Sequence, residues 1–448
     1  MAFTNSFAPT PICCPARSTI LTGQLGHNTG VLTNQGDQGG WATFVRNGGE
    51  DRTVAKALSE QAGYRTALIG KHLNGYGVGN ALDYPVEYVP PGWSDWYGSV
   101  EGNFYTGYNY ILNENGHLTT YGASEADYST DVMRDKAVAV IRDAEVEDDD
   151  QPIFMYLAST APHQPLPPPV RYADNPYADS TAPAQPNFAE ADLSDKPLWL
   201  RASGDTRAAG VAANNDEDWQ NRMGSLYAVD DMVAAVVAEL RTNGELDHTY
   251  FVFTSDNGYN LGAHRLPQKM VPYEESIRVP LVIAGPGIDK GRTMAFALQT
   301  DIAPTLYEMA GLPSPSFVDG RSLVPLLAGE TPEDWRQDFP VQYVNNLASR
   351  GPEVEVSPGT PAELSAFLGI DIPGYRALRT ERYLYVEWYD EENAERLHEY
   401  ELYDLVADPW QLDNILATSE GRDATEDLVA ALDARLAELT ACVGESCR

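Results

Sequence analysis

The chain has 448 residues, of which 43% are hydrophobic, so it is long enough to bury a large core. Its formal net charge of −36 argues against a nucleic acid or an anionic membrane as the main partner, because both would repel it. No apolar run approaches the roughly 20 residues needed to cross a bilayer, and residues 1–12 lack the features of a signal peptide, so we expect no membrane span.

The first chemically notable segment is a cysteine pair in front of a short helix. Cys13, Cys14 and Pro15 precede a helix-compatible run that Gly23 would end. A helix N-terminus favours anions and lowers the pKa of a thiol. The residues alone leave two hypotheses open: a reactive cysteine beside Arg17, or a buried cysteine pair with a structural role.

Strand-like runs then alternate with helical stretches, which is typical of an α/β fold with a mixed, largely parallel sheet flanked by helices. Lys71, His163 and Asp256 each follow one of these strand-like runs. Ligands collect beyond the carboxyl ends of parallel strands, so we expect these polar groups to meet at one rim. The predicted elements are helices over 53–62 and 131–143 and strands over 64–69, 152–157 and 250–254. We expect the strand over 152–157 to be buried.

The last quarter of the chain has a different pattern. We predict a catalytic domain over 1–335 and a smaller C-terminal subdomain over 336–448, with a small antiparallel sheet and a terminal helix. Residues 172–198 are rich in Pro, Ala, Asp and Asn without periodicity and predict a long surface loop. From their position alone, we expect substrate specificity to lie in 172–198 and 345–370. The predicted C-terminal elements are strands over 339–344, 375–388 and 401–405 and a helix over 424–440.

The two remaining cysteines, Cys442 and Cys447, are spaced so that a disulfide could close a short loop. A bridge would imply an oxidising compartment, and two free thiols are the alternative.

Several motifs resemble those of one enzyme family. The run Cys13-Cys14-Pro15-Ala16-Arg17, followed by Thr22-Gly23, is similar to the signature of the type I sulfatases of the alkaline phosphatase superfamily. The flanking segments look most like the branch that contains N-acetylglucosamine-6-sulfatases. Further segments resemble the family in the same order: Gly70-Lys71-His72-Leu73-Asn74-Gly75-Tyr76, Pro90-Pro91-Gly92-Trp93, Ala161-Pro162-His163, Ser255-Asp256-Asn257-Gly258, residues 273–280 and 401–405.

The resemblance implies a modified nucleophile and a metal ion. Cys13 would be converted to Cα-formylglycine by the formylglycine-generating enzyme. Asp256, Asn257 and the residue at position 13 would bind Ca²⁺, or Mg²⁺ in its place, since both metals prefer oxygen ligands. Without the resemblance, the Asp-Asn-Gly run would be read as an ordinary turn after a strand.

The resemblance also implies how a sulfate ester is held and cleaved. Arg17, Lys71 and Lys269 would bind the sulfate, and His163 would be the acid for the leaving group or a hydrogen-bond donor that binds the sulfate. One hydroxyl of the hydrated aldehyde would attack sulfur, and the second would then expel sulfate. The further substrate-binding candidates are His72, Asn74 and His264.

Three departures from the family pattern stand out. Family members begin with a buried strand that ends in two adjacent aspartates, both metal ligands, and this strand is missing from the sequence; a shortened chain or a degenerate member would each explain it. Leu73 stands where many members have histidine. The segment 264–269 is one residue short, because it lacks the usual glycine before Lys269.

The predicted function is therefore a sulfuric ester hydrolase acting on a sulfated sugar or an aryl sulfate, in an extracytoplasmic or secreted setting. Two alternatives remain: a phosphoric or phosphonic ester hydrolase of the same superfamily, and a catalytically impaired sulfatase-like binding protein.

Overall fold

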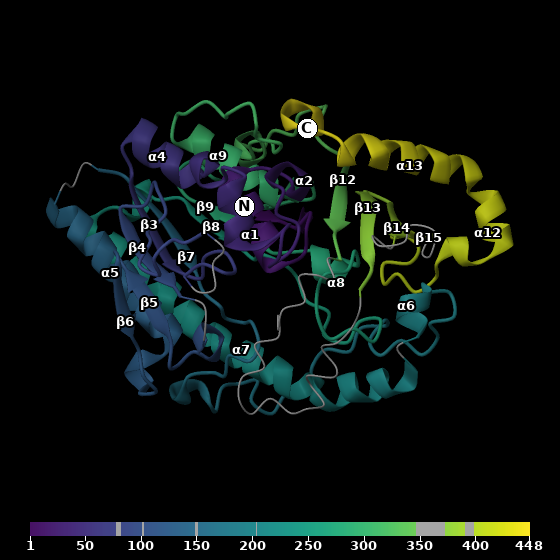
Figure 1. Ribbon diagram of the computed structural model, residues 1–448, viewed down its shortest axis with the longest axis horizontal. Helices are drawn as coiled ribbons and strands as arrows, with labels where there is room; N and C mark the ends of the chain where they lie inside the picture. Colours follow the sequence, from purple (N-terminus) through teal and green to yellow (C-terminus); the bar gives the residue numbers. More distant parts are fainter. Residues whose placement is uncertain (78–81, 101–102, 148–150, 203, 346–371, 390–397) are drawn as a thin grey trace.

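The computed structural model describes residues 1–77, 82–100, 103–147, 151–202, 204–345, 372–389 and 398–448. Within them the chain is α/β, with three sheets of four or five strands and helices on their faces (Figure 1). The helices are α1 Cys13–Thr22, α2 Gly26–Thr29, α3 Gly40–Arg46, α4 Val54–Ala62, α5 Ser129–Glu147, α6 Leu198–Arg201, α7 Gly204–Asn243, α8 Glu274–Ile277, α9 Ile302–Met309, α10 Val324–Leu327, α12 Ser419–Ala424 and α13 Glu426–Thr440.

A five-stranded sheet carries the first part of the site, in the order β6-β5-β4-β3-β7. Its centre is parallel, because β3 pairs in parallel with both β4 and β7, whereas β5 and β6 are antiparallel additions. The helix α4 begins at Thr53, whose side chain accepts from the Lys56 amide, and ends at Gly63, whose φ of 71° suits glycine. The strands are β3 Arg65–Gly70, β4 Asp95–Ser99, β5 Ile111–Glu114, β6 His117–Thr120 and β7 Ile153–Ala158.

A four-stranded sheet carries the second part, in the order β10-β1-β9-β8. The sequence predicted that the strand over 250–254 would share a rim with those over 64–69 and 152–157. The structure places it in a separate sheet among the described residues, although its carboxyl end still meets the others. The strands are β1 Ala2–Phe3, β8 Phe251–Thr254, β9 Leu281–Ala284 and β10 Arg292–Thr293, and a two-stranded pair joins β2 Ser6–Phe7 to β11 Ala297–Leu298.

The strands β7 and β8 are the edges of these two sheets, and each pairs on one side only among the described residues. Both pack on α5 and α7, because Met155, Leu157 and Phe251 contact the same cluster of buried side chains from those helices. Residues 153–157 are only half-buried and Phe253 is 50% exposed. The prediction of a buried strand over 152–157 was therefore wrong in its burial, because one edge of β7 has no described partner.

The C-terminal elements agree with the sequence. The antiparallel sheet β12-β13-β14-β15 is followed by α12 and α13, and α13 packs on it through Leu432, Leu436 and Leu439 (Figure 1). Trp388 from this sheet shares one buried cluster with Phe7, so the domain boundary near 336 stays a prediction. The strands are β12 Asp338–Tyr343, β13 Gly374–Thr380, β14 Tyr383–Tyr389 and β15 His398–Asp404.

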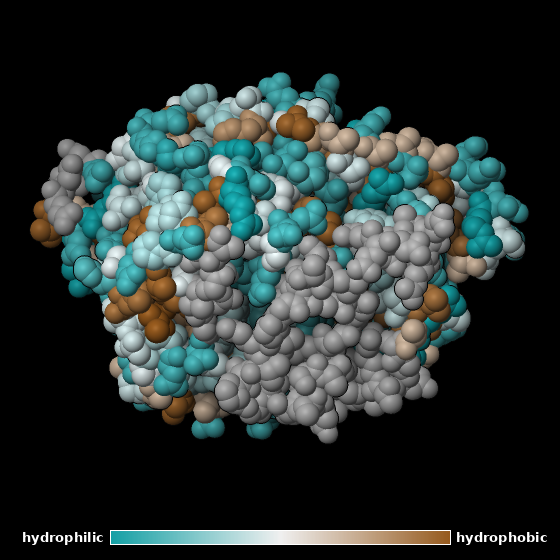
Figure 2. Space-filling view, viewed as in Figure 1, coloured by the Kyte–Doolittle hydropathy of each residue, from teal (hydrophilic) through white to brown (hydrophobic). Residues whose placement is uncertain are grey.

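The predicted disulfide is confirmed. Cys442 and Cys447 form a disulfide, and the backbone carbonyl of Cys442 accepts a hydrogen bond from Asn28 at 3.0 Å. No described helix is long and apolar enough to span a membrane. The coloured atoms in Figure 2 are mostly hydrophilic or neutral, and the hydrophobic ones among them form separate small groups.

The unequal strand pairing predicts unequal protection of backbone amides from hydrogen exchange. β3 is paired on both sides, so its amides should exchange slowly, whereas β7 and β8 should exchange faster. Hydrogen–deuterium exchange followed by mass spectrometry on peptides covering 65–70, 153–158 and 251–254 measures this. Equal protection of all three peptides would show that the outer edges of β7 and β8 are covered.

Candidate active site around residue 13

The helix α1 begins at Cys13, which is 2% exposed, and ends before Gly23 at a φ of 73°. The backbone before it is extended at Ile12, so Cys13 is the first residue of the helix. The Cys14 amide donates to the Asn34 side chain at 2.9 Å. An anion at residue 13 would therefore meet the positive end of a helix.

Arg17 lies one helical turn after Cys13 and joins three elements. Its Nε donates to Asp256 Oδ2 at 2.8 Å, and its Nη1 donates to the backbone carbonyl of Lys71 at 2.9 Å. Lys71 directly follows β3, and Asp256 follows β8 after one residue. The carboxyl ends of strands from two sheets therefore meet at α1.

Two lysines complete the positive surroundings of residue 13. Lys269 Nζ lies 3.0 Å from Cys13 Sγ and 3.2 Å from Asn257 Oδ1. Lys71 is 6% exposed and its Nζ lies 4.9 Å from the centre of the Tyr105 ring. Lys269 reaches the site although its segment lacks a glycine, and Met270 next to it takes the left-handed backbone, with φ 78°.

The buried charges change the ionisation of the site. Burial by itself would raise the pKa of Cys13, but Lys269 and Lys71 lower that pKa well below its ordinary value. Burial raises the pKa of its neighbour Cys14 to about 12. The pKa of Asp256 is lowered against the effect of burial, mainly by Arg17. Three cations thus surround one carboxylate, leaving an excess of positive charge for an anion.

His163 also reaches residue 13, from the loop after β7. Its Nδ1 contacts the backbone carbonyl of Gln164, which can only accept, so Nδ1 carries the proton and Nε2 is free to accept. Burial, and then Lys269, lower its pKa, while the nearby Cys13 opposes this shift. The imidazole is therefore neutral at neutral pH.

The structure does not bring every predicted residue into contact with these groups. His264 is fully buried, and its Nδ1 lies 2.6 Å from Glu190 Oε2. Its Nε2 faces Asn187 and its ring packs on Tyr273, so its described contacts do not include Cys13. A substrate-binding role for His264 has no described contact to support it.

His72 and Asn74 lie near the site but face the protein interior. The His72 ring packs against Tyr76 and Trp96, and burial lowers its pKa to about 3. Its Nε2 and the Asn74 Oδ1 are buried without a partner among the described residues. Their predicted role as substrate ligands stays a prediction.

Sequence reasoning missed two residues that shape the site. Tyr105 lies against Lys71 and His163, and it belongs to no motif. Gln299 donates to the backbone carbonyls of Ser255 and Asp256, at 2.9 and 2.7 Å, and so holds the turn that carries Asp256. A lone tyrosine or glutamine has no spacing signal, so only the fold reveals them.

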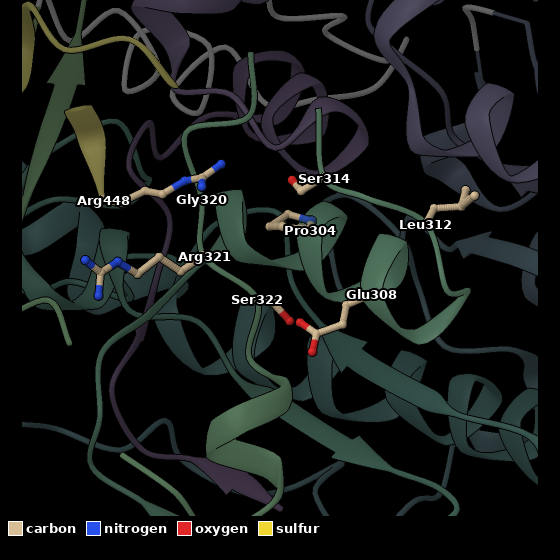
Figure 3. A pocket seen from close by; sticks show the side chains of 8 residues that line it. All are labelled: Pro304, Glu308, Leu312, Ser314, Gly320, Arg321, Ser322 and Arg448. Carbon is tan, nitrogen blue, oxygen red and sulfur yellow. The ribbon is translucent and has the colours of Figure 1, made fainter. Parts of the chain in front are cut away.

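A separate cavity of about 310 Å³ is lined by Pro304, Glu308, Leu312, Ser314, Gly320, Arg321, Ser322 and Arg448. Figure 3 shows the two arginines on one side of it and the Glu308 carboxylate on the other. Arg321 donates to the backbone carbonyl of Asp334 and Arg448 to that of Val318. The cavity contains none of the groups around Cys13.

The different pKa shifts of the two adjacent cysteines predict selective alkylation in the unconverted protein. Cys13 should react with iodoacetamide at a rate that rises less between pH 7 and pH 9 than that of an ordinary thiol, since its pKa is lowered well below the usual range. Cys14 should stay unlabelled over this range, because its pKa is raised to about 12. Fragment mass spectrometry locates the label. A rate that climbs as for an ordinary thiol, with a pKa of about 8.5, would contradict the charge arrangement.

The comparisons with known proteins agree with this geometry. The family model described as Sulfatase matches residues 1–312. The chain is 32% identical to an N-acetylglucosamine-6-sulfatase of Homo sapiens, over 100% of this chain and 80% of the relative. It is also 32% identical to an arylsulfatase of Volvox carteri, over 99% of this chain and 70% of the relative.

Two solved structures share the fold at lower identity. A protein in complex with its substrate D-glucosamine-2-N,6-O-disulfate has a TM-score of 0.71 and 24% identity, covering 97% of this chain and 90% of that one. A phosphonate monoester hydrolase from Silicibacter pomeroyi has a TM-score of 0.70 and 21% identity, covering 97% and 87%. These likenesses establish an alkaline phosphatase-like fold. With the family match and the curated relatives, they show that the chain belongs to the sulfatase family and is a sulfuric ester hydrolase.

Proposed function

We propose that this sulfatase removes sulfate from a 6-O-sulfated amino sugar or a related glycan fragment, through a formylglycine formed at position 13. The observation that carries the proposal is the convergence of Arg17, Lys71 and Lys269 on the first residue of α1. A sulfate ester is a tetrahedral anion, and preorganised cations stabilise the charge that develops on its oxygens during cleavage. The relatives named for N-acetylglucosamine-6-sulfate support this choice of sugar.

The chemical step uses the hydrated aldehyde, whose oxygens would occupy the position of Cys13 Sγ. One hydroxyl attacks sulfur as the bond from sulfur to the sugar oxygen breaks. Lys269, 3.0 Å from Sγ, lies close enough to bind both the nucleophile and the sulfuryl oxygens. The second hydroxyl then loses its proton, the carbonyl re-forms and sulfate leaves.

His163 fits the role of proton carrier in this sequence. Its neutral Nε2 can accept the proton of the attacking hydroxyl and return a proton to the departing sugar oxygen. The contact of Nδ1 with the Gln164 carbonyl fixes the tautomer that this role needs. The geometry therefore supports base catalysis first and acid catalysis second.

Membership of the family implies a divalent metal, but the described residues fit calcium poorly on their own. Calcium takes six to eight oxygen ligands. Asp256 and Asn257 offer side-chain oxygens. Arg17 already binds one oxygen of Asp256, and Lys269 binds the side-chain oxygen of Asn257. Further oxygen ligands are needed before these residues could hold the ion.

Maturation and location follow from the same proposal. The formylglycine-generating enzyme would act on Cys13 before the chain folds, because Cys13 is 2% exposed in the folded chain. The Cys442–Cys447 disulfide and the extracellular sulfatases among the relatives support an extracytoplasmic setting.

The proposal is tested by turnover together with the mass of the peptide covering residues 8–23. Protein made in a host that converts such cysteines should carry an aldehyde at position 13 and should release sulfate from 4-nitrophenyl sulfate and from glucosamine 6-sulfate. Faster hydrolysis of 4-nitrophenyl phosphate by converted protein would favour the phosphoric ester alternative. An unmodified thiol and no turnover would favour the non-catalytic one.

Lys269→Met removes one cation while keeping side-chain length. We expect kcat for aryl sulfate to fall roughly 100-fold, because one stabilising donor at the developing charge is lost. Lys290→Met, at an exposed lysine, is the matched control and should keep wild-type kcat. Similar kcat values for the two variants would show that Lys269 takes no part in the chemical step.

The shortage of oxygen ligands predicts weak calcium binding by the 448-residue chain. Calorimetric titration should give a Kd no tighter than about 1 mM, the weak end of protein calcium sites. Asp256→Asn should change the Kd for calcium little, since Arg17 already binds the Asp256 carboxylate. Tight, saturable binding that Asp256→Asn abolishes would show that the described residues suffice.

A further inference from the structure

Tyr105 lies in the short 3-10 helix Asn103–Thr106, between β4 and β5, and contacts two of the site residues. The Lys71 ammonium is 4.9 Å from the centre of its ring. The His163 ring lies 4.7 Å away, centre to centre, at an interplanar angle of 52°. One aromatic ring therefore packs against both the predicted sulfate lysine and the predicted proton carrier.

The hydroxyl of Tyr105 has a proton available for donation. Burial raises the pKa of the phenol and Lys71 only partly opposes this, so the group stays protonated at neutral pH. The group against its ring is the Lys71 ammonium, 4.9 Å from the ring centre. An ammonium can only donate hydrogen bonds, so Lys71 cannot accept the phenol O–H.

The surroundings of this O–H favour an anionic acceptor. The ring contacts Lys71 and His163, so the phenol lies on their side of the site. A tetrahedral oxyanion between these cations would supply an acceptor for the O–H in a charge-assisted hydrogen bond.

We propose that Tyr105 is a further anion-binding residue, whose O–H donates to an oxygen of the sulfuryl group held at residue 13 while its ring positions Lys71 and His163. The proposal rests on the proposed function, because it assigns a fourth donor to the same sulfate. In this proposal the hydroxyl of Tyr105 contributes to sulfate binding, whereas the ring contributes to the positions of Lys71 and His163.

The test uses the full chain with Cys13→Ser, in which a neutral hydroxyl replaces the thiolate that would repel an anion. Inorganic sulfate is titrated by calorimetry into this protein and into the same protein with Tyr105→Phe. We expect roughly tenfold weaker sulfate binding in Tyr105→Phe, as for the loss of one hydrogen bond to a charged group. Unchanged sulfate affinity would overturn the proposal.

Tyr108→Phe is the matched control, because Tyr108 lies in the same connection but packs on Tyr128, outside the site. It should leave sulfate affinity at the Cys13→Ser value. Tyr105→Leu also removes the ring and should additionally shift the pH profile of kcat in converted protein, because His163 loses its packing. If Tyr105→Phe and Tyr108→Phe weaken sulfate binding equally, the effect is general and the proposal fails.

Failure of this inference can be told apart from failure of the proposed function. Sulfate affinity is measured without turnover, so a loss in Tyr105→Phe supports the donor role even if converted protein prefers phosphate esters. Conversely, converted protein that hydrolyses sulfate esters with the same kcat/KM in Tyr105→Phe would support the sulfatase function. It would show at the same time that Tyr105 does not donate a hydrogen bond to the anion. Matching thermal unfolding curves establish that each variant is folded.

Discussion

The contacts of the Arg17 guanidinium are the interaction on which the site depends. Arg17 binds the Asp256 carboxylate beyond β8 and the Lys71 carbonyl beyond β3, and its own helix begins with Cys13. The two strands belong to different sheets among the described residues, so this one side chain brings their ends together. Burial makes the ion pair rigid but leaves little tolerance for losing either partner, since an unpaired buried charge is strongly destabilising.

The second constraint is charge balance. Arg17, Lys71 and Lys269 are all buried, whereas Asp256 is the carboxylate that faces them. Such an excess of cations is stable only with an anion among them, whether a thiolate, a sulfate or a sulfate ester. The overall charge of −36 describes the rest of the surface, so local and global charge have opposite signs here. Net charge argued against a nucleic acid or an anionic membrane as the main partner but could not indicate this site.

The sequence predicted the motifs better than their surroundings. Cys13, Arg17, Lys71, Asp256 and Lys269 were identified because they stand in motifs that resemble those of the sulfatase family, and the structure places them together. The pairing of β7 and β8 could not be predicted, since an apolar run looks the same whether its edge is paired or open. His264 was predicted to bind substrate from its place in a motif. Its actual contact with Glu190 depends on a loop with no periodicity, so the sequence could not indicate it. Tyr105 was missed because only tertiary packing distinguishes it.

The central claim is that residue 13 lies in a preformed tetrahedral-anion site. Crystals of the Cys13→Ser protein grown with selenate test it directly, because selenium gives an anomalous signal and matches sulfate in shape and charge. We predict one strong peak at the N-terminus of α1, within hydrogen-bonding distance of Lys71 and Lys269. A peak confined to the cavity between Arg321 and Arg448, or no peak near residue 13, would contradict the account.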